Sequence, residues 1–242
     1  MSAKCDVRIY DIRKAPERKN LHNFTGRIHD VKTPIVTVLG TDCAVGKRTT
    51  AVNLVDALIE AGLKASFIAT GQTGLLQGAK YGVAVDVLSS GFATGEIENA
   101  IINAYENDNP DIIVVEGQGA LSHPAFTSSS AIIRGAVPNA IILQHPPHRK
   151  DHCDFPGIPM PTIESEIELL EVFSKSPVIA ITLNHEYMTD NEVKQTIVEY
   201  EYKYELPTTD VLKFGSEKLV EVLFNVFPEL RKRASVLCQP QE

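Results

Sequence analysis

The clearest chemical pattern in the chain is a glycine-containing run that ends in a lysine. It follows an apolar, β-rich stretch and precedes an amphipathic helical pattern, which is the setting of a phosphate-binding loop. In such a loop, backbone N–H groups turn around an anion, while the helix N-terminus and the lysine add positive charge. The residues predicted to bind a phosphate-bearing cofactor are Gly40, Thr41, Asp42, Cys43, Ala44, Val45, Gly46, Lys47, Arg48, Thr49 and Thr50.

Two departures from the usual nucleotide-binding pattern affect the interpretation. Five residues separate Gly40 from Gly46, where the common motif has four. Arg48 follows the lysine, in place of the Ser or Thr whose hydroxyl would hold Mg²⁺. The run therefore indicates phosphate binding more strongly than nucleotide hydrolysis.

A carboxylate follows the apolar run Ile112–Val115, at the position of Glu116. Ligands of open parallel sheets bind beyond the carboxyl ends of the strands, so we expect Glu116 near Lys47. It could accept a proton or hold a metal through water, or it could cap the following turn. His123 is a second candidate base, with a surface loop position as the alternative.

Polar residues after two further strands are candidates for substrate binding. Gln72 and Thr73 follow the run Ala65–Ala69 in a glycine-rich segment, and Gln118 lies two residues beyond Glu116. Their amides and hydroxyl can orient a polar substrate. A plain flexible loop is the alternative interpretation of the segment that holds Gln72 and Thr73.

Residues 144–161 form the longest stretch predicted to be irregular, and they are rich in proline. Long ordered loops are often functional. The stretch contains His145, His148, His152 and Cys153, but their spacing matches no common closed zinc site, so we predict no metal centre. Arg149 and Lys150 are predicted to bind a carboxylate or phosphate, or else to be solvated charges.

Asn184 follows the last apolar run. Its amide offers one donor and one acceptor, which suits the edge of a purine, so it is predicted to contact the cofactor. Capping of a helix is the alternative role.

Continuous apolar runs alternate with helical patterns, which is typical of a doubly wound α/β fold with a mainly parallel sheet and helices on both faces. The predicted strands are Ile35–Leu39, Ala65–Ala69, Ile112–Val115, Ala140–Leu143 and Val178–Thr182. The predicted helices are Arg48–Ala61, Gly95–Glu106, Ile163–Lys175, Asn191–Tyr204 and Glu217–Arg233, the last broken near Pro228.

The 242 residues suit one large α/β domain with a short appendage. Residues 1–33 are interpreted as a leader or linker with one strand, Asp6–Asp11, and residues 34–242 as the α/β domain. The net charge of −8 argues against a nucleic-acid or anionic membrane surface. Because the start of the chain lacks a signal-peptide core and the cysteines show no paired spacing, we expect a cytoplasmic protein.

Four motifs in order carry a family resemblance. GTDCAVGKRTT and VVEGQG resemble the paired signatures of dethiobiotin synthetase and its P-loop relatives. Together with ATGQTGLLQGAKYG, the longer VVEGQGALSHPAF and DFPGIPMP, they look like the D-glutamate N-acetyltransferase family, formerly a domain of unknown function. The resemblance implies a P-loop NTPase-like fold, and residues 1–33 resemble only the end of the Rossmann-like domain that precedes it in that family.

The resemblance also implies a reaction. Acetyl-CoA would donate an acetyl group to D-glutamate or a similar acidic amino acid, and Arg48 would replace the charge of a metal at the CoA phosphates. Glu116 would be the base, His123 the reserve base and Arg149 the carboxylate clamp, in a homo-oligomer that binds small molecules. Two alternatives stay open: an ATP- and Mg²⁺-dependent kinase or ligase of dethiobiotin synthetase type, in which Thr49 or Asp42 supports the metal together with Glu116, and a non-catalytic nucleotide-binding module.

Overall fold

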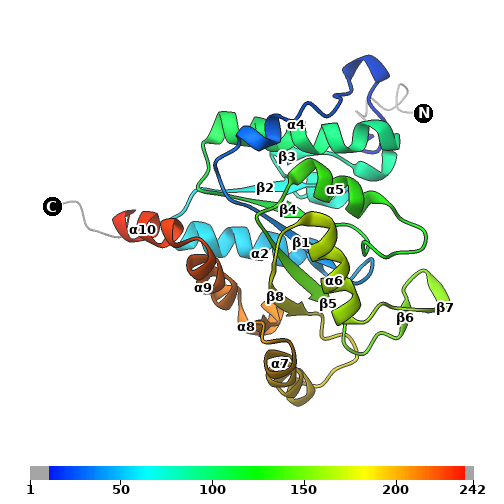
Figure 1. The fold of residues 1–242 in the computed structure, drawn as a ribbon, viewed down its shortest axis with the longest axis vertical. Coiled ribbons are helices and arrows are strands. Elements are labelled where there is room, and N and C mark those ends of the chain that lie inside the picture. Colours follow the sequence, from blue (N-terminus) through cyan, green and yellow to red (C-terminus); the bar gives the residue numbers. More distant parts are fainter. Residues whose placement is uncertain (1–10, 238–242) are drawn as a thin grey trace, which may run out of the picture.

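A parallel β-sheet organises the molecule, as a computed structural model of the chain shows (Figure 1). The model describes residues 11–237, and the side chains of residues 11–234. The strands occur in the order β3-β2-β4-β1-β5-β8-β9, and every neighbouring pair is parallel. They are β1 (Ile35–Gly40), β2 (Ala65–Ala69), β3 (Tyr81–Gly82), β4 (Ile112–Glu116), β5 (Ala140–His145), β8 (Val178–Leu183) and β9 (Thr208–Thr209).

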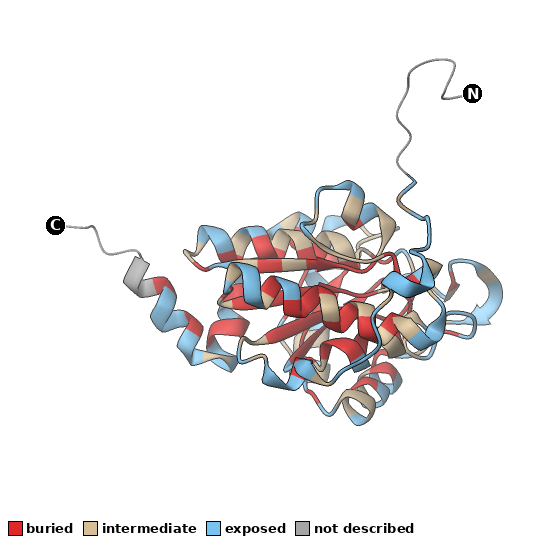
Figure 2. Cartoon of the chain, turned by 90° about the horizontal axis from the view of Figure 1, so that it is seen from above, coloured by how far each residue is buried: buried red, intermediate tan, exposed pale blue. Residues whose placement is uncertain are grey.

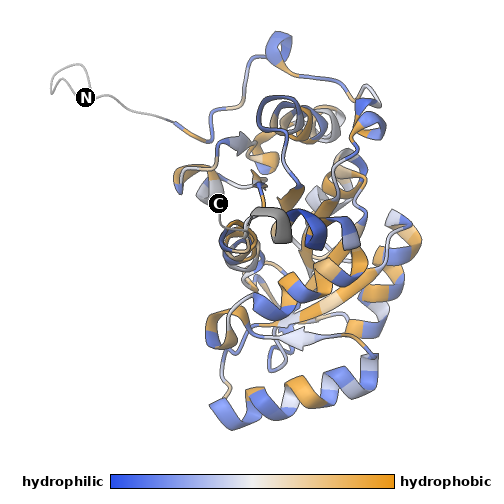
Figure 3. Cartoon of the chain, turned by 90° about the vertical axis from the view of Figure 1, so that its left-hand side faces the viewer, coloured by the Kyte–Doolittle hydropathy of each residue, from blue (hydrophilic) through white to orange (hydrophobic). Residues whose placement is uncertain are grey.

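Helices cover both faces of this sheet, which is why the central strands are mainly apolar instead of alternating between apolar and polar residues. Successive residues of β1 point to opposite sides, so Ile35 and Leu39 join one core and Val36 and Val38 the other. Figure 2 shows buried residues concentrated in the sheet and on the inward sides of the helices, and Figure 3 shows the same strands as the hydrophobic centre.

The two cores draw on different helices. One face packs against α4 (Ser90–Asp108), α5 (Ser128–Ala136), α6 (Ile163–Ser174) and α7 (Asp190–Tyr204). The other face packs against α2 (Lys47–Glu60), α9 (Glu217–Val226) and α10 (Pro228–Leu237). Two short helices, α3 (Gln72–Leu76) and α8 (Val211–Phe214), follow β2 and β9.

The fold class and the five predicted strands are confirmed; every strand begins where predicted, and each ends within one residue of the prediction except β5, which is two residues longer. The terminal helix does break at Pro228, into α9 and α10. Of the predicted strand Asp6–Asp11, all but the last residue lies outside the described residues.

Other predictions are corrected. Helix α4 begins five residues before the predicted start, at Ser90, and α5 was not predicted because Ser128, Ser129 and Ser130 open it. Residues 144–161 are not one irregular loop. The first two complete β5, and an antiparallel hairpin follows, formed by β6 (Asp151–His152) and β7 (Phe155–Pro159).

The described part of the predicted leader runs along α4. It includes two 3₁₀ turns, η1 (Arg18–Asn20) and η2 (Arg27–Asp30), and a third turn, η3 (Val85–Val87), precedes α4. The buried carboxylate of Glu98 accepts hydrogen bonds from the backbone N–H groups of Thr25 and Ile28, at 2.6 and 3.1 Å. This segment is therefore fixed to the α/β domain by specific contacts. None of the helices in the described part of the chain has the length and apolar character needed to cross a bilayer.

Candidate active site around the P-loop

The loop between β1 and α2 lies at the carboxyl edge of the sheet, where the ends of β4, β5 and β8 also meet. Ala44 and Gly46 have φ values of 50° and 103°, the left-handed conformations that turn the loop. Gly46 is the N-cap residue of α2, and because it has no side chain, no side-chain hydrogen bond caps this helix. The first N–H groups of α2 are thus available to an anion.

Four successive carbonyl groups at the tip of the loop accept hydrogen bonds from side chains. Lys47 Nζ donates to Asp42 O, and Asn184 Nδ2 donates to Val45 O at 3.0 Å. The Arg149 guanidinium donates to Cys43 O at 2.8 Å and to Ala44 O at 3.3 Å. These contacts hold the carbonyls on one side of the loop.

On the other side of the loop, the backbone N–H groups have no partner among the described residues. The backbone N–H groups of residues 44–47 donate to no described residue. A buried or semi-buried N–H group needs a partner, and these face a cavity of about 460 Å³. The arrangement is that of an oxyanion or phosphate site made from backbone donors.

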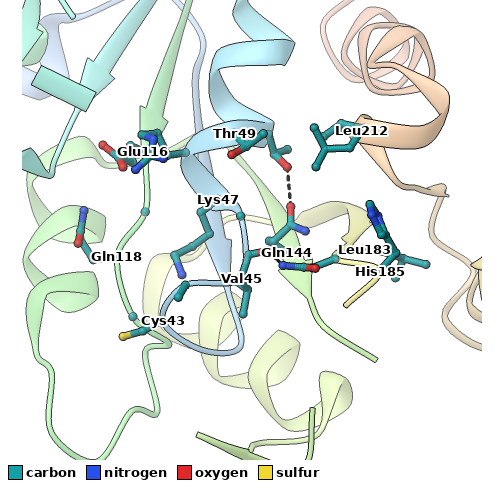
Figure 4. Close-up of a pocket in the computed structure, with 18 residues that line it drawn as sticks. Cys43, Val45, Lys47, Thr49, Glu116, Gln118, Gln144, Leu183, His185 and Leu212 are labelled. Atoms are coloured by element: carbon teal, nitrogen blue, oxygen red, sulfur yellow. Dashed lines mark hydrogen bonds between the residues drawn. The ribbon is translucent and has the colours of Figure 1, made fainter. Parts of the chain in front are cut away.

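Figure 4 shows this cavity, with Lys47 between two walls. Glu116 and Gln118 lie on one wall, from the end of β4, and Gln144, Leu183 and Leu212 lie on the other. The lining consists of residues 43–50, Glu116, Gly117, Gln118, Gly119, Gln144, Leu183, Asn184, His185, Val211 and Leu212.

The cavity joins several of the predicted site residues. Cys43 to Thr50, Glu116, Gln118 and Asn184 all line it. Gly40, Thr41 and Asp42 lie in the same loop but support it from outside the cavity; the Thr41 hydroxyl, for example, bonds His145 Nδ1 at 2.9 Å. Gln72, Thr73, His123, Arg149 and Lys150 do not line the cavity, so their contact with a ligand stays a prediction.

Burial shifts the pKa of the two ionisable groups that flank the cavity. Loss of water lowers the pKa of Lys47 to about 8, and the lysine side chain is 5% exposed. Burial raises the pKa of Glu116. It outweighs the opposite effect of the hydrogen bond that Glu116 Oε2 accepts from the Thr70 N–H at 3.0 Å, which lowers the pKa. Such a carboxylate is a stronger base than an exposed one.

Asp42 is the centre of a buried charge network behind the loop. Its Oδ2 accepts from Arg149 at 2.8 Å and from the Cys153 N–H at 2.9 Å, and its Oδ1 lies 2.7 Å from His152 Nδ1. Burial alone would raise the pKa of Asp42, but the hydrogen bonds from His152, Cys153 and Arg149 outweigh it and lower the pKa. Arg149 also forms two 2.7 Å bonds to the carboxylate of Glu186.

The five N–H groups of Arg149 are therefore committed to Asp42, Glu186 and the loop carbonyls. A substrate carboxylate could bind this guanidinium only by displacing Glu186 or the loop. The geometry gives Arg149 a role in holding the P-loop, and its role as a carboxylate clamp stays a prediction.

His123, Asp42 and His152 are close enough to hold a metal ion, since their ligand atoms lie within 4.8 Å of one another. His123 Nδ1, however, accepts from the N–H groups of Ala125 and Phe126 at 3.1 and 3.3 Å. In a neutral imidazole the proton is then on Nε2, which lies 3.6 Å from Asp42 Oδ1. In this tautomer Nε2 is a donor and the two backbone N–H groups engage the lone pair of Nδ1; the role of His123 as reserve base stays a prediction.

Seven lining residues were not among the predicted site residues: Gly117, Gly119, Gln144, Leu183, His185, Val211 and Leu212. Gln144, Leu183 and His185 lie at or just beyond the carboxyl ends of β5 and β8, the positions that the topology rule singles out. That rule, applied to every residue type and not only to charged ones, would have found them.

The fold and the loop define a P-loop protein, and comparison with known proteins identifies its family. Residues 22–220 match the P-loop domain of DUF1611, described as a domain of unknown function. The chain belongs to this DUF1611 family.

The chain is 31% identical over 235 residues to a protein from Tritonibacter scottomollicae named D-glutamate N-acetyltransferase, a match that covers 88% of this chain and 69% of that protein. A protein of the same name from a Pseudoalteromonas species is 31% identical over 226 residues, covering 91% of this chain and 66% of that protein. The chain thus spans about two thirds of the length of these relatives.

Among solved structures, a DUF1611 family protein from Anabaena variabilis superposes with a TM-score of 0.83 at 32% identity, over 89% of this chain and 64% of that one. A plasmid partition protein from Borrelia burgdorferi, solved with AMPPNP, superposes with a TM-score of 0.50 at 12% identity, over 82% of this chain and 99% of that one. The second similarity concerns the fold alone.

We predict that Asp42→Asn lowers the free energy of unfolding by about 3 kcal/mol, because it leaves the buried Arg149 short of a charged partner. Urea denaturation followed by circular dichroism measures this. Asp154→Asn is the control, on an exposed residue of the same hairpin, and should change stability by less than about 0.5 kcal/mol. Equal effects of the two substitutions would contradict the network.

We further predict that affinity for a phosphate-bearing ligand falls as the pH rises above about 8. Lys47 binds an anion as a cation, and its pKa of about 8 in the free protein means that it loses its proton there. Phosphate groups are already ionised above pH 7, so the ligand contributes no opposite trend. Calorimetric titration from pH 6.5 to 9.5 should show a plateau and then a decline, whereas a flat profile across that range would exclude Lys47 from binding.

Proposed function

We propose that this protein is an amino-acid N-acyltransferase that transfers an acetyl group from acetyl-CoA to D-glutamate or a similar acidic amino acid. The observation that supports the proposal is one cavity lined both by residues 43–50 of the P-loop and by the buried carboxylate of Glu116, whose pKa is raised by burial. The names of the relatives supply the acceptor and the acyl group.

The cradle suits a cofactor that is held and not cleaved. Backbone N–H groups of residues 44–47, Lys47 and the start of α2 surround an anion. Arg48 lines the cavity and has no hydrogen bond or ion pair to any described residue, so its guanidinium is available to phosphate. A guanidinium supplies charge there without a metal.

An ATP- and Mg²⁺-dependent reaction fits the same residues less well. Asp42 is one carboxylate that could support the metal, but its oxygens are occupied by Arg149, His152 and the Cys153 N–H. The position after Lys47 is an arginine, which would repel the cation.

In the proposed reaction, Glu116 accepts a proton from the ammonium group of the amino acid. The freed amine nitrogen then attacks the thioester carbonyl carbon, forming a C–N bond and an oxyanion that backbone N–H groups can stabilise. Cleavage of the C–S bond expels CoA as a thiolate. Of the two protons that the nitrogen loses, one ends on the CoA sulfur and the other reaches solvent.

Gln118 is proposed to contact the acceptor. Its Nε2 donates to the Thr70 hydroxyl at 2.8 Å, and the side chain lines the cavity beside Glu116. Helix α3 starts with Gln72 and Thr73, directly after Gly71. A Cβ atom on Gly71 would lie 3.0 Å from Gln118 Nε2 and 3.7 Å from Glu116 Oε1, so this part of the chain runs close to both side chains. Gln72 and Thr73 are the proposed further contacts, together with Lys150. We expect the protein to act as a homo-oligomer in the cytoplasm.

We predict that Glu116→Gln reduces turnover by about 10²- to 10⁴-fold with little change in affinity for acetyl-CoA, because the amide keeps the shape but cannot accept the proton. Release of free CoA thiol in the presence of acetyl-CoA and D-glutamate measures turnover, and calorimetry measures affinity. The assay requires a wild-type protein first shown to be active.

Glu186→Gln is the matched control for this substitution, since Glu186 binds Arg149 and does not line the cavity. It should affect turnover far less than Glu116→Gln. Normal turnover of the Glu116→Gln protein would assign Glu116 a purely structural role and refute this mechanism.

A further inference from the structure

Gln144 has a side-chain amide whose orientation is fixed by two hydroxyl groups. It ends the buried strand β5, and its Oε1 accepts hydrogen bonds from Thr50 Oγ1 at 2.5 Å and from Thr182 Oγ1 at 2.6 Å (Figure 4 draws the bond from Thr50). Separations of 2.5 and 2.6 Å are typical of O–H···O hydrogen bonds and shorter than N–H···O bonds, which assigns the atom between the two hydroxyls as the amide oxygen.

The NH₂ group consequently faces the cavity. Gln144 Nε2 donates to no residue in the described part of the chain, although the side chain as a whole is 2% exposed and lines the cavity. A Cβ atom on Gly46 would lie 3.8 Å from this nitrogen and 3.9 Å from Asn184 Nδ2. Two amide groups thus flank the open side of the loop glycine.

The position of this donor relative to the cradle indicates what it binds. The phosphate cradle lies at Lys47 and the start of α2, and the cavity continues past Gly46 to a wall that includes Leu183 and Leu212. A ligand anchored by one phosphate must pass Gln144 to reach that wall. The group next to a bound phosphate in CoA and in nucleoside diphosphates is the second phosphate of a diphosphate.

We propose that Gln144 is a ligand-binding residue whose Nε2 donates a hydrogen bond to the diphosphate group of the cofactor. The inference rests on the proposed function only in placing a diphosphate-bearing ligand at the P-loop.

Gln144→Glu is the sharpest test, since it retains an oxygen for Thr50 and Thr182 and replaces the NH₂ donor by a carboxylate oxygen. We expect calorimetry to show at least about 10-fold weaker binding of both CoA and ADP, since a hydrogen bond to a charged group is lost. Gln144→Met, which removes the donor without adding charge, should weaken both ligands about 10- to 100-fold and answers the question if the first variant does not fold.

Thr37→Val is the control for altering a polar group in the buried sheet. Thr37 Oγ1 is buried in the adjacent strand β1 without a partner among the described residues. This variant should bind both ligands within about twofold of the wild type. Equal weakening by Thr37→Val and the Gln144 variants would mean that the sheet and not the donor is responsible, which overturns the proposal.

Two further outcomes are decisive. Folded Gln144 variants that bind CoA and ADP as tightly as the wild type, or that lose affinity for only one of them, overturn the assignment to the shared diphosphate. Lys47→Ala separates this failure from a failure of the proposed function. If Lys47→Ala weakens binding and the Gln144 variants do not, only this inference fails; if Lys47→Ala has no effect, the P-loop is not the cofactor site.

Discussion

The pairing of Arg149 with the buried carboxylate of Asp42 is the interaction on which the site depends. It fixes a guanidinium behind the P-loop, where the same group donates hydrogen bonds to the carbonyl oxygens of Cys43 and Ala44. Lys47 and Asn184 donate hydrogen bonds to the neighbouring carbonyl groups, so the carbonyl side of the loop backbone is fully hydrogen-bonded. The N–H side is thereby turned to the cavity, which makes an anion site from backbone groups alone.

This constraint also ties together segments that are far apart in the sequence. The carboxylate of Asp42 contacts the β6–β7 hairpin through His152 and the Cys153 N–H. Arg149, which precedes the hairpin, binds Glu186 beyond the end of β8. The irregular stretch after β5 is thus part of the support of the P-loop. Its polar contacts to one carboxylate explain why an acidic residue is buried behind the loop: Asp42 balances the charge of Arg149, while Lys47 and Arg48 line the cavity.

Much of the fold was predictable because it rests on local patterns. Strands buried on both faces produce continuous apolar runs, as in Ile112–Val115, and the P-loop has a recognisable glycine and lysine spacing. Short elements were not predictable in this way. The hairpin β6–β7 contains prolines and only a few paired residues, and α5 starts with serines, so neither has a strong periodic signal.

Site residues could be predicted where their place depends on the order of the strands. They could not be predicted where their role depends on hydrogen bonds between distant parts of the chain. Glu116 and Gln118 come directly after a strand that neighbours β1, so topology alone brought them to the cavity. The commitment of Arg149 to Asp42 joins residues 107 positions apart, and the tautomer of His123 depends on two backbone N–H groups. No spacing in the sequence encodes either contact, and both change the chemistry that those residues can perform.

We propose that the P-loop holds the phosphates of an acyl-CoA without a metal. Calorimetric titration of the wild-type protein with acetyl-CoA and with ATP, each with Mg²⁺ and with a chelator, tests this binding mode. We expect acetyl-CoA to bind more tightly than ATP, with an affinity that the chelator leaves unchanged. Tighter binding of ATP that requires Mg²⁺ would refute this binding mode and favour a nucleotide-dependent enzyme.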